Sequence, residues 1–174
     1  MTKVLIVFSP SDFAKSRINK ALIAAINDLE DVTIHILDES APNYKFDLAK
    51  EQALMEDHDV IVLQFPMYWY SCPALMKLWI DEVFQYGWAF GSSGRALEGK
   101  MLVCASSQGG SAHDFTVEGD YLYTVDEFFR PFEITAKFCK MNFGMPFLIY
   151  DTSNVTDQEL ETYAADYRGW LQQF

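Results

Sequence analysis

Short apolar segments alternate along the chain with stretches whose apolar residues recur every three or four positions. Short apolar runs are typical of strands buried on both faces of a parallel sheet, and the longer spacing is typical of amphipathic helices. Strands are therefore expected at residues 3–8, 32–36, 60–63, 101–105 and 147–150. In the second of these, apolar and polar side chains alternate, which predicts a half-covered strand at the sheet edge with His35 facing solvent.

Helical patterns follow the first, third, fourth and fifth of these strands. The apolar residues of 18–29 form a single stripe. The apolar residues of 74–86 cover more than one stripe, which indicates a second burial partner and hence a subunit interface. Capping-box sequences that begin at Thr124 and Thr156 predict where the last two helices start.

Five strands that alternate with helices predict a three-layer α/β fold, in which a doubly wound parallel sheet is covered on both faces. No linker, repeat or low-complexity segment interrupts the pattern, so residues 1–174 are expected to form a single domain. In such sheets, ligands bind beyond the carboxyl ends of the strands, where the strand order reverses. The loops that follow residues 8, 65 and 105 are therefore the ones to consider for function.

Charge and composition exclude several classes of function. A formal net charge of −12 disfavours binding to nucleic acid or to an anionic membrane, and no apolar run approaches the roughly 20 residues of a membrane span. Three widely spaced cysteines form no disulfide framework or zinc motif, which fits a protein of the reducing cytoplasm. The three histidines lack the spacing of metal ligands, so no metal site is expected.

The first of the three loops carries hydroxyl groups but no glycine fingerprint of a dinucleotide site. Free N–H groups at a helix N-terminus favour an anion. Ser9, Ser11 and Ser16 are therefore candidates to donate hydrogen bonds to a phosphate at that point. The alternative is that Ser16 only caps the helix.

The second loop places three consecutive rings, Tyr68, Trp69 and Tyr70, directly after a buried strand. Consecutive side chains of an extended segment cannot all face one core, so at least one ring must face solvent, a partner chain or a ligand. A flat heteroaromatic ligand is the simplest explanation. In the third loop, Gly109 and Gly110 allow the backbone to approach such a ligand closely.

The segment Gln64–Phe84, QFPMYWYSCPALMKLWIDEVF, resembles the signature of the NAD(P)H:quinone oxidoreductase family. Shorter motifs support the resemblance at Gly87–Gly91 (GWAFG), Leu97–Lys100 (LEGK) and Arg130–Glu133 (RPFE). The chain is most similar to the short bacterial branch, which includes potassium-efflux ancillary proteins and general-stress proteins. This resemblance implies a flavodoxin-like sheet of order 2-1-3-4-5 and a homodimer with one flavin, FMN or FAD, in each subunit. It also implies ping-pong transfer of two electrons from NADH or NADPH to a quinone.

The resemblance further implies which residues form the site. The cofactor-binding residues would be Ser9, Ser16, Asn19, Pro66, Met67, Tyr68, Trp69, Tyr70, Ser107, Gln108, Gly109 and Gly110. The substrate pocket would contain Trp88, Phe90 and Phe115. Three positions depart from the family pattern: Ser9 stands where a histidine is frequent, Gln108 where a threonine is usual, and Phe115 where a tyrosine is frequent. Because Phe115 cannot donate a hydrogen bond, His113 is considered as a substitute, although it is more easily explained as an exposed loop residue.

Three hypotheses for function follow. The first is a flavin-dependent NAD(P)H:acceptor oxidoreductase that reduces quinones. The second is a flavin-binding ancillary subunit that regulates a membrane transporter and has little turnover of its own. A one-electron flavodoxin carrier is disfavoured, because a carrier needs neither a helix suited to a subunit interface nor a nicotinamide pocket.

Overall fold

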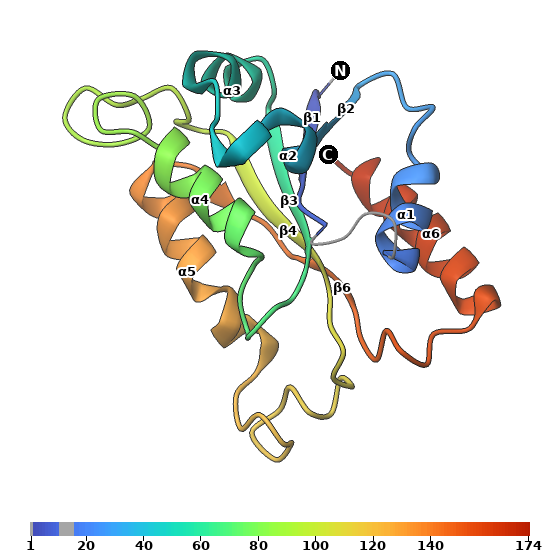
Figure 1. Ribbon diagram of the computed structural model, residues 1–174. Coiled ribbons are helices and arrows are strands. Elements are labelled where there is room, and N and C mark those ends of the chain that lie inside the picture. Colours follow the sequence, from blue (N-terminus) through green and yellow to red (C-terminus); the bar gives the residue numbers. More distant parts are fainter. Residues whose placement is uncertain (1, 11–15) are drawn as a thin grey trace.

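The computed structural model describes residues 2–10 and 16–174, and its centre is a parallel sheet between two layers of helices (Figure 1). The strands are β1 (Val4–Phe8), β2 (Val32–Ile36), β3 (Val60–Pro66), β4 (Met101–Ser107), β5 (Asn142–Phe143) and β6 (Phe147–Ile149). They are arranged in the order β2-β1-β3-β4-β5, with β6 also pairing with β4, and every pair is parallel. The flavodoxin-like order 2-1-3-4-5 expected from the sequence is confirmed.

The last position of the sheet is occupied by two short strands, where the sequence predicted one strand at 147–150. Both β5 and β6 pair with β4, the first with its beginning and the second with its end. Gly144 and Pro146 lie between them. A Cβ atom on Gly144 would lie only 2.5 Å from Val103 Cγ1, and a proline has no N–H to donate to a ladder. The edge of the sheet is therefore interrupted at this point.

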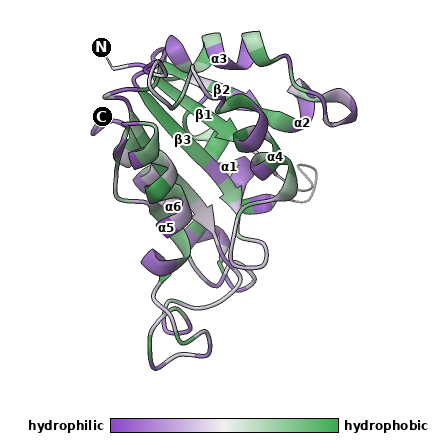
Figure 2. Cartoon of the chain, turned by 90° about the vertical axis from the view of Figure 1, so that its left-hand side faces the viewer, coloured by the Kyte–Doolittle hydropathy of each residue, from purple (hydrophilic) through white to green (hydrophobic). Residues whose placement is uncertain are grey.

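The helices are α1 (Arg17–Ala24), α2 (Leu37–Ser40), α3 (Leu48–Glu56), α4 (Ala74–Val83), α5 (Val125–Phe138) and α6 (Asp157–Leu171), with a short 3₁₀ helix η1 (Pro42–Tyr44). Helices α1 and α6 cover one face of the sheet, and α3, α4 and α5 cover the other. The strands alternate between the two cores, so that Leu5 faces one and Ile6 the other. Figure 2 shows the hydrophobic strands in the centre and helices in which hydrophobic and hydrophilic residues are mixed.

Both predicted capping boxes are present at the helix starts. The Glu127 carboxylate accepts a hydrogen bond from the Thr124 N–H (2.8 Å) at the start of α5. At the start of α6, Glu159 accepts from the Thr156 N–H (2.8 Å), and the Thr156 hydroxyl accepts from the Glu159 N–H (3.2 Å). These contacts satisfy N–H groups that a helix start leaves without partners. No helix in residues 2–10 and 16–174 is long and apolar enough to cross a lipid bilayer.

The expectation that His35 faces solvent is wrong. Its side chain is only 11% exposed, and its Nε2 lies 2.7 Å from Glu51 Oε2. The same carboxylate oxygen accepts a hydrogen bond from Trp79 Nε1 (2.8 Å). The cause is α3, a helix that the apolar pattern did not reveal because few of its side chains are buried apolar ones. This helix covers the polar side of β2 and places a buried carboxylate against the imidazole.

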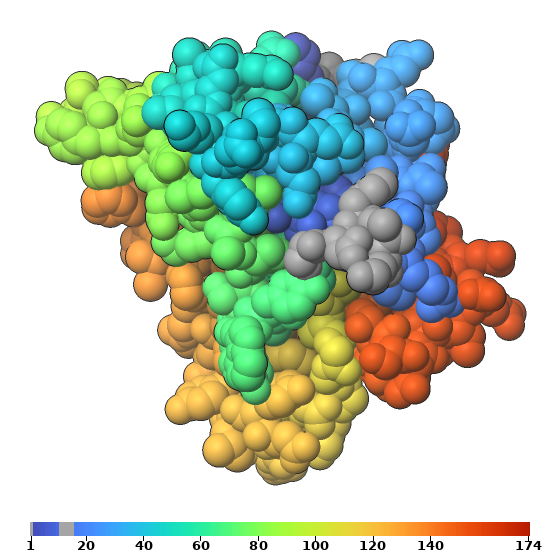
Figure 3. All heavy atoms as spheres, in the orientation of Figure 1, coloured from blue at the N-terminus to red at the C-terminus, as the bar shows by residue number. Residues whose placement is uncertain are grey.

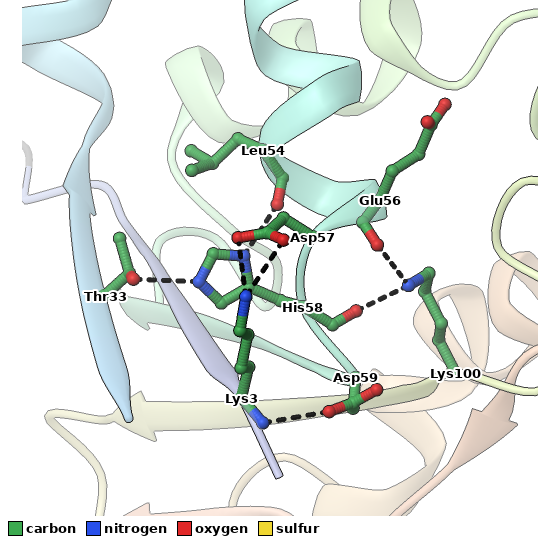
Figure 4. Close-up of polar contacts among 8 residues, drawn as sticks. All are labelled: Lys3, Thr33, Leu54, Glu56, Asp57, His58, Asp59 and Lys100. Carbon is green, nitrogen blue, oxygen red and sulfur yellow. Dashed lines mark hydrogen bonds and ion pairs between the residues drawn. The ribbon is translucent and has the colours of Figure 1, made fainter. Parts of the chain in front are cut away.

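Polar contacts close the amino-terminal edge of the sheet (Figure 4). The buried His58 ring lies between the Leu54 carbonyl oxygen (2.7 Å from Nδ1) and Thr33 Oγ1 (2.8 Å from Nε2). Lys100 Nζ donates to the carbonyl oxygens of Glu56 (2.8 Å) and His58 (2.6 Å). A cation at this point satisfies carbonyls that the C-terminus of α3 leaves free. These groups hold the fold together, and the loops of interest lie at the opposite edge.

Candidate functional site

The loops after β1, β3 and β4 meet at the carboxyl edge of the sheet. Backbone hydrogen bonds join them: the Ser9 N–H donates to the Gln64 carbonyl (3.1 Å), and the Met67 N–H donates to the Ser107 carbonyl (2.8 Å). The loop after β4 is joined in turn to the end of β6 by the bond from the Gln108 N–H to the Ile149 carbonyl (2.8 Å). In the space-filling view, the segment after β3 (green) lies against the segment after β4 (yellow to orange) at the lower end of the molecule (Figure 3). Two hollows lie among these loops.

The first hollow, which we call the polar hollow, has a volume of about 220 Å³ and lies at the N-terminus of α1. Its lining residues are Ser16, Arg17, Ile18, Asn19, Pro66, Ser107 and Thr152. Asn19 Nδ2 donates to Ser16 Oγ (3.1 Å) and to Ser107 Oγ (3.3 Å), so that the three side chains form one polar group. The Ser16 side chain makes no capping hydrogen bond to α1. Hydroxyls and helix N–H groups in this arrangement favour an anion such as a phosphate.

Arg17 lines the polar hollow, but its charge is already paired. Its guanidinium donates to the Val155 carbonyl oxygen (2.7 Å) and pairs with the Asp157 carboxylate at the start of α6. Among the described residues, an anion held in the polar hollow would therefore depend on neutral donors and on the helix terminus. Ser11, the other hydroxyl considered in this loop, lies outside the described residues.

A buried hydrogen-bond network fixes the floor of the polar hollow. Gln64 Nε2 donates to Asn19 Oδ1 (3.1 Å), and the Tyr167 hydroxyl donates to Gln64 Oε1 (2.8 Å). All three residues are buried, and burial raises the pKa of the Tyr167 phenol far above its usual range. The network connects α1, β3 and α6 and holds the Asn19 amide in one orientation.

The second hollow, the aromatic hollow, also has a volume of about 220 Å³. Its lining residues are Met67, Trp69, Tyr70, Gln108, Gly109, Gly110, Phe115 and Tyr121. Gly109 leaves open space here, since a Cβ atom on it would meet no other atom within 4 Å. A flat ring therefore has room to lie against the backbone of the third loop.

The turn that carries the consecutive rings has an unusual backbone. Trp69 (φ 46°) and Tyr70 (φ 63°) both lie in the left-handed region, between two hydrogen bonds that join Tyr68 and Ser71 (2.9 and 3.0 Å). Type I′ turns require a positive φ at both central residues, and these positions are usually occupied by glycine or asparagine. Side chains larger than glycine cost about 1–3 kcal/mol each there, and such strain concentrates at functional sites. The turn presents Trp69 with 90% of its surface exposed beside the aromatic hollow.

The side-chain amide of Gln108 is buried beside the aromatic hollow. The residue is only 2% exposed, and within the part of the chain that the structure describes neither Nε2 nor Oε1 makes a hydrogen bond. An unpaired buried amide is costly to a folded protein, because both its donor and its acceptor have lost water. Since Gln108 lines the aromatic hollow, a ligand that offers a neighbouring acceptor and donor would satisfy it.

Tyr121 is a residue of the site that the sequence analysis missed. Its ring packs against Phe115 (centroids 4.8 Å apart) and Tyr70 (5.3 Å) and lines the aromatic hollow with them. Phe115 is buried in this aromatic cluster, so most of its ring surface is covered by neighbouring side chains and only a small part can contact a substrate. The only signal in the sequence was a local one, three rings within residues 115–123, and nothing in it distinguished Tyr121 from Tyr123.

Most of the residues expected at the site lie on the two hollows, but five do not line either. Ser9 is buried directly after β1, where its N–H donates to the Gln64 carbonyl, and Tyr68 is the half-exposed first residue of the strained turn. His113 is exposed, and its carbonyl oxygen accepts a hydrogen bond from Thr116 Oγ1 (2.8 Å). The other two, Trp88 and Phe90, belong to another part of the molecule.

Trp88 and Phe90 lie in the loop between α4 and β4, away from both hollows of the same chain. Trp88 Nε1 donates to Glu56 Oε1 (2.6 Å), and the Phe90 ring packs on Phe138 (5.1 Å) in a groove between α4 and α5. They do not join Phe115 in one pocket within this chain.

The three cysteines, Cys72, Cys104 and Cys139, are buried, an environment that disfavours the thiolate. Burial raises the pKa of the Cys72 thiol, and it raises the pKa of Cys139 to about 11. Cys104 is fully buried in the core, as expected for a small apolar side chain. No cluster of metal-ligating side chains occurs in residues 2–10 and 16–174.

Comparison with known proteins agrees with this architecture. The model of the family described as "Flavodoxin-like fold" matches residues 2–172. An uncharacterized NAD(P)H oxidoreductase of Bacillus subtilis (strain 168) is 39% identical over 93% of this chain and 93% of its own. A potassium-efflux system ancillary protein of Cronobacter sakazakii, described as glutathione-regulated, is 38% identical over 97% of this chain and 92% of its own.

Two solved structures are similar to nearly the whole chain. General stress protein 14 of Treponema denticola, solved in complex with FMN, has a TM-score of 0.94 and 41% identity and covers 98% of each chain. An NADPH-quinone reductase of P. pentosaceus has a TM-score of 0.87 and 30% identity, with 98% of this chain and 97% of its own covered.

Proposed function

Because the chain belongs to the flavodoxin-like fold family, we propose that it binds FMN across the two hollows and transfers two electrons from NAD(P)H to a quinone-type acceptor. The observation that carries the proposal is the buried, unpaired amide of Gln108 beside the open space at Gly109. The pyrimidine edge of a flavin offers carbonyl acceptors next to an N–H donor, which is the complement of a primary amide.

The residues present fit the parts of FMN. The polar hollow supplies the Ser16 and Ser107 hydroxyls and the N-terminus of α1 for a phosphate. The aromatic hollow supplies Trp69 and Met67 for a flat ring, and Gln108 for its polar edge. We favour FMN over FAD because FMN is bound in the similar structure from Treponema denticola.

The protein's part in the reaction would be to bind and orient. A bound flavin supplies the two-electron chemistry that amino-acid side chains lack. Asn19, held by Gln64, would keep the phosphate donors in place. Gln108 would fix the ring in its plane and donate toward the edge that gains negative charge on reduction. The strained turn would cover the ring with Trp69 and limit the access of water.

The proposal includes a homodimer. The outer face of α5 exposes Ile134 and Phe138, which adjoin the groove that contains Phe90. Large exposed apolar side chains around one groove are characteristic of association surfaces. Sedimentation equilibrium would give twice the chain mass if this part of the proposal is right, and the mass of one chain if it is wrong.

The test of the activity begins with the cofactor. The protein is purified, its absorbance spectrum is recorded, and the released cofactor is identified by mass. The flavin-loaded protein is then assayed with NADH and with NADPH, using a quinone as acceptor. Colourless protein that takes up neither FMN nor FAD on reconstitution would contradict the proposal.

A second function is favoured by one comparison, the similarity to the ancillary protein of the potassium-efflux system. In that case the chain would bind flavin but act mainly by docking onto a membrane transporter. Flavin binding with negligible oxidation of NAD(P)H in the absence of a partner would favour this function. Rapid turnover of the isolated protein would favour the enzyme.

A further inference from the structure

Tyr121 places a phenol hydroxyl against the backbone of Gly110, in the wall of the aromatic hollow. A Cβ atom on Gly110 would lie 2.7 Å from the Tyr121 hydroxyl oxygen and 2.7 Å from its Cε2. The tyrosine can therefore approach this closely only because residue 110 is a glycine. Gly109, which precedes Gly110 in the sequence, borders the open space of the aromatic hollow. The Tyr121 hydroxyl therefore lies next to the space that a bound molecule could occupy.

Contacts with neighbouring residues fix the orientation of the Tyr121 side chain. Phe115 and Tyr70 meet its ring at 67° and 70°, the edge-to-face geometry that aromatic pairs prefer. Its backbone N–H donates to the Asp114 carbonyl oxygen (3.1 Å). The Asp114 carboxylate in turn accepts from the Ser111 N–H (2.6 Å) and hydroxyl (2.9 Å). The phenol is thus held by the same loop that carries the two glycines.

The hydroxyl is available as a hydrogen-bond donor. Among residues 2–10 and 16–174 it has no hydrogen-bond partner, unlike the Tyr167 hydroxyl, which is paired with Gln64. Loss of contact with water raises the pKa of the Tyr121 phenol, and the nearby negative charge of Asp114 raises it further. The group therefore keeps its proton at neutral pH and can donate a hydrogen bond but not act as a base.

The other donors around the aromatic hollow are less suited to a substrate. Gln108 is buried and is taken up by the cofactor in the proposed function. Tyr70 is turned onto Phe128, with which it stacks at 24° and 5.4 Å. Trp69 is 90% exposed on the strained turn. Of the side-chain donors named here, Tyr121 is the one whose orientation is fixed by packing beside the open space of the aromatic hollow.

We propose that the Tyr121 hydroxyl donates a hydrogen bond to a carbonyl oxygen of the quinone-type acceptor, and that it makes the protein prefer acceptors that carry such an oxygen. This inference rests on the proposed function. When a quinone takes a hydride from a reduced flavin, its ring gains two electrons and one proton. One of its oxygens then carries a negative charge until a second proton arrives from water. A fixed donor at that oxygen stabilises the charge as it develops.

The test compares Tyr121→Phe with Tyr123→Phe in the flavin-loaded protein. Tyr123 is a matched control, because it is an exposed tyrosine of the same loop that does not line the hollow. Menadione serves as the carbonyl acceptor, and ferricyanide serves as an acceptor that takes single electrons and offers no carbonyl oxygen. Binding of menadione to the oxidised protein is also measured by titration calorimetry with no NAD(P)H present, so that this readout does not depend on turnover.

For Tyr121→Phe we expect the Kd of menadione to rise about tenfold and kcat/KM for menadione to fall by at least about the same factor. The FMN Kd and the rate with ferricyanide should stay within about twofold of the wild type, as should every value for Tyr123→Phe. Unchanged menadione binding and an unchanged preference between the acceptors would overturn the inference. So would a rise in the FMN Kd, which would assign Tyr121 to the cofactor. Wild-type protein that binds no flavin at all would instead overturn the proposed function, and this inference with it.

Discussion

Gln64 and Gln108 are buried glutamines at the carboxyl edge of the same sheet, and their side-chain amides differ in their hydrogen bonds to the residues that the structure describes. Gln64 donates to Asn19 and accepts from Tyr167. Gln108 has no partner for either amide atom within the described part of the chain. Both are almost fully buried, at 0% and 2% exposure. Gln64 thus helps to hold the fold together, whereas in the proposed function Gln108 binds the ligand.

The largest expected effect is on stability, from Gln64→Met. This change leaves Asn19 Oδ1 and the Tyr167 hydroxyl buried without their partner, so the free energy of unfolding should fall by about 2–4 kcal/mol. Urea unfolding measures it. Adding Tyr167→Phe to the variant removes one unpaired group and should recover part of the loss. A variant as stable as the wild type would show that the Gln64 network does not hold the fold.

The same change at Gln108 should act on the ligand and not on the fold. In flavin-free Gln108→Met the free energy of unfolding should stay within about 1 kcal/mol of the wild type or rise, because an unpaired buried amide is removed. The FMN Kd should rise about 100-fold, since the ring loses two hydrogen bonds from a site without water. Fluorescence quenching of free FMN measures the affinity. A loss of stability equal to that of Gln64→Met would show that Gln108 also belongs to the fold.

Trp69→Ala tests whether the strained turn, like Gln108 in the proposed function, acts on FMN binding and not on the stability of the fold. The side chain is 90% exposed, so its removal should leave urea unfolding of the flavin-free protein nearly unchanged. FMN binding should weaken by about 1–2 kcal/mol if the ring or its turn packs on the flavin. Wild-type affinity for FMN would remove the turn from the proposed site.

The smallest effect concerns the start of α6, the helix that supplies Tyr167 to Gln64. Hydrogen bonds from the Thr156 N–H and hydroxyl lower the pKa of the Glu159 carboxyl below its ordinary value of 4.5. A lowered pKa means that this contribution to stability is complete above pH 4.5 and is lost as the pH falls through the folded value. The stability difference between the wild type and Glu159→Gln should therefore be present at pH 7 and shrink toward pH 3. A difference that does not change with pH would exclude the charged capping box as its source.

The sequence predicted the strands and the two capped helices well because their signals are local. Continuous apolar runs marked β1, β3 and β4, and the capping boxes marked the starts of α5 and α6. Helix α3 was missed because its few buried side chains include a charged one, Glu51. The error about His35 followed directly, since its partner lies on that helix.

The candidate site was predicted in part, for a similar reason. A parallel sheet brings the carboxyl ends of its strands to one edge. The three loops identified in the sequence therefore meet at that edge, independently of the contacts that their side chains make. Trp88 and Phe90 were grouped with Phe115 by resemblance, but the fold places Trp88 against Glu56 and Phe90 against Phe138. Tyr121 and Tyr123 look equivalent in the sequence, and only packing against Gly110 separates them.

The sequence by itself determined the alternation of strands and helices, the edge at which the loops meet, and the ring and glycine content of those loops. Only the tertiary structure decided that the Gln64 amide is paired and that the Gln108 amide has no partner in residues 2–10 and 16–174. The partners of Gln64 lie 45 and 103 positions away along the chain, and no local pattern reports a contact over such a distance. A hydrogen bond between buried side chains depends on the relative positions of the helices and strands that carry them. Those positions are determined by the packing of the whole fold.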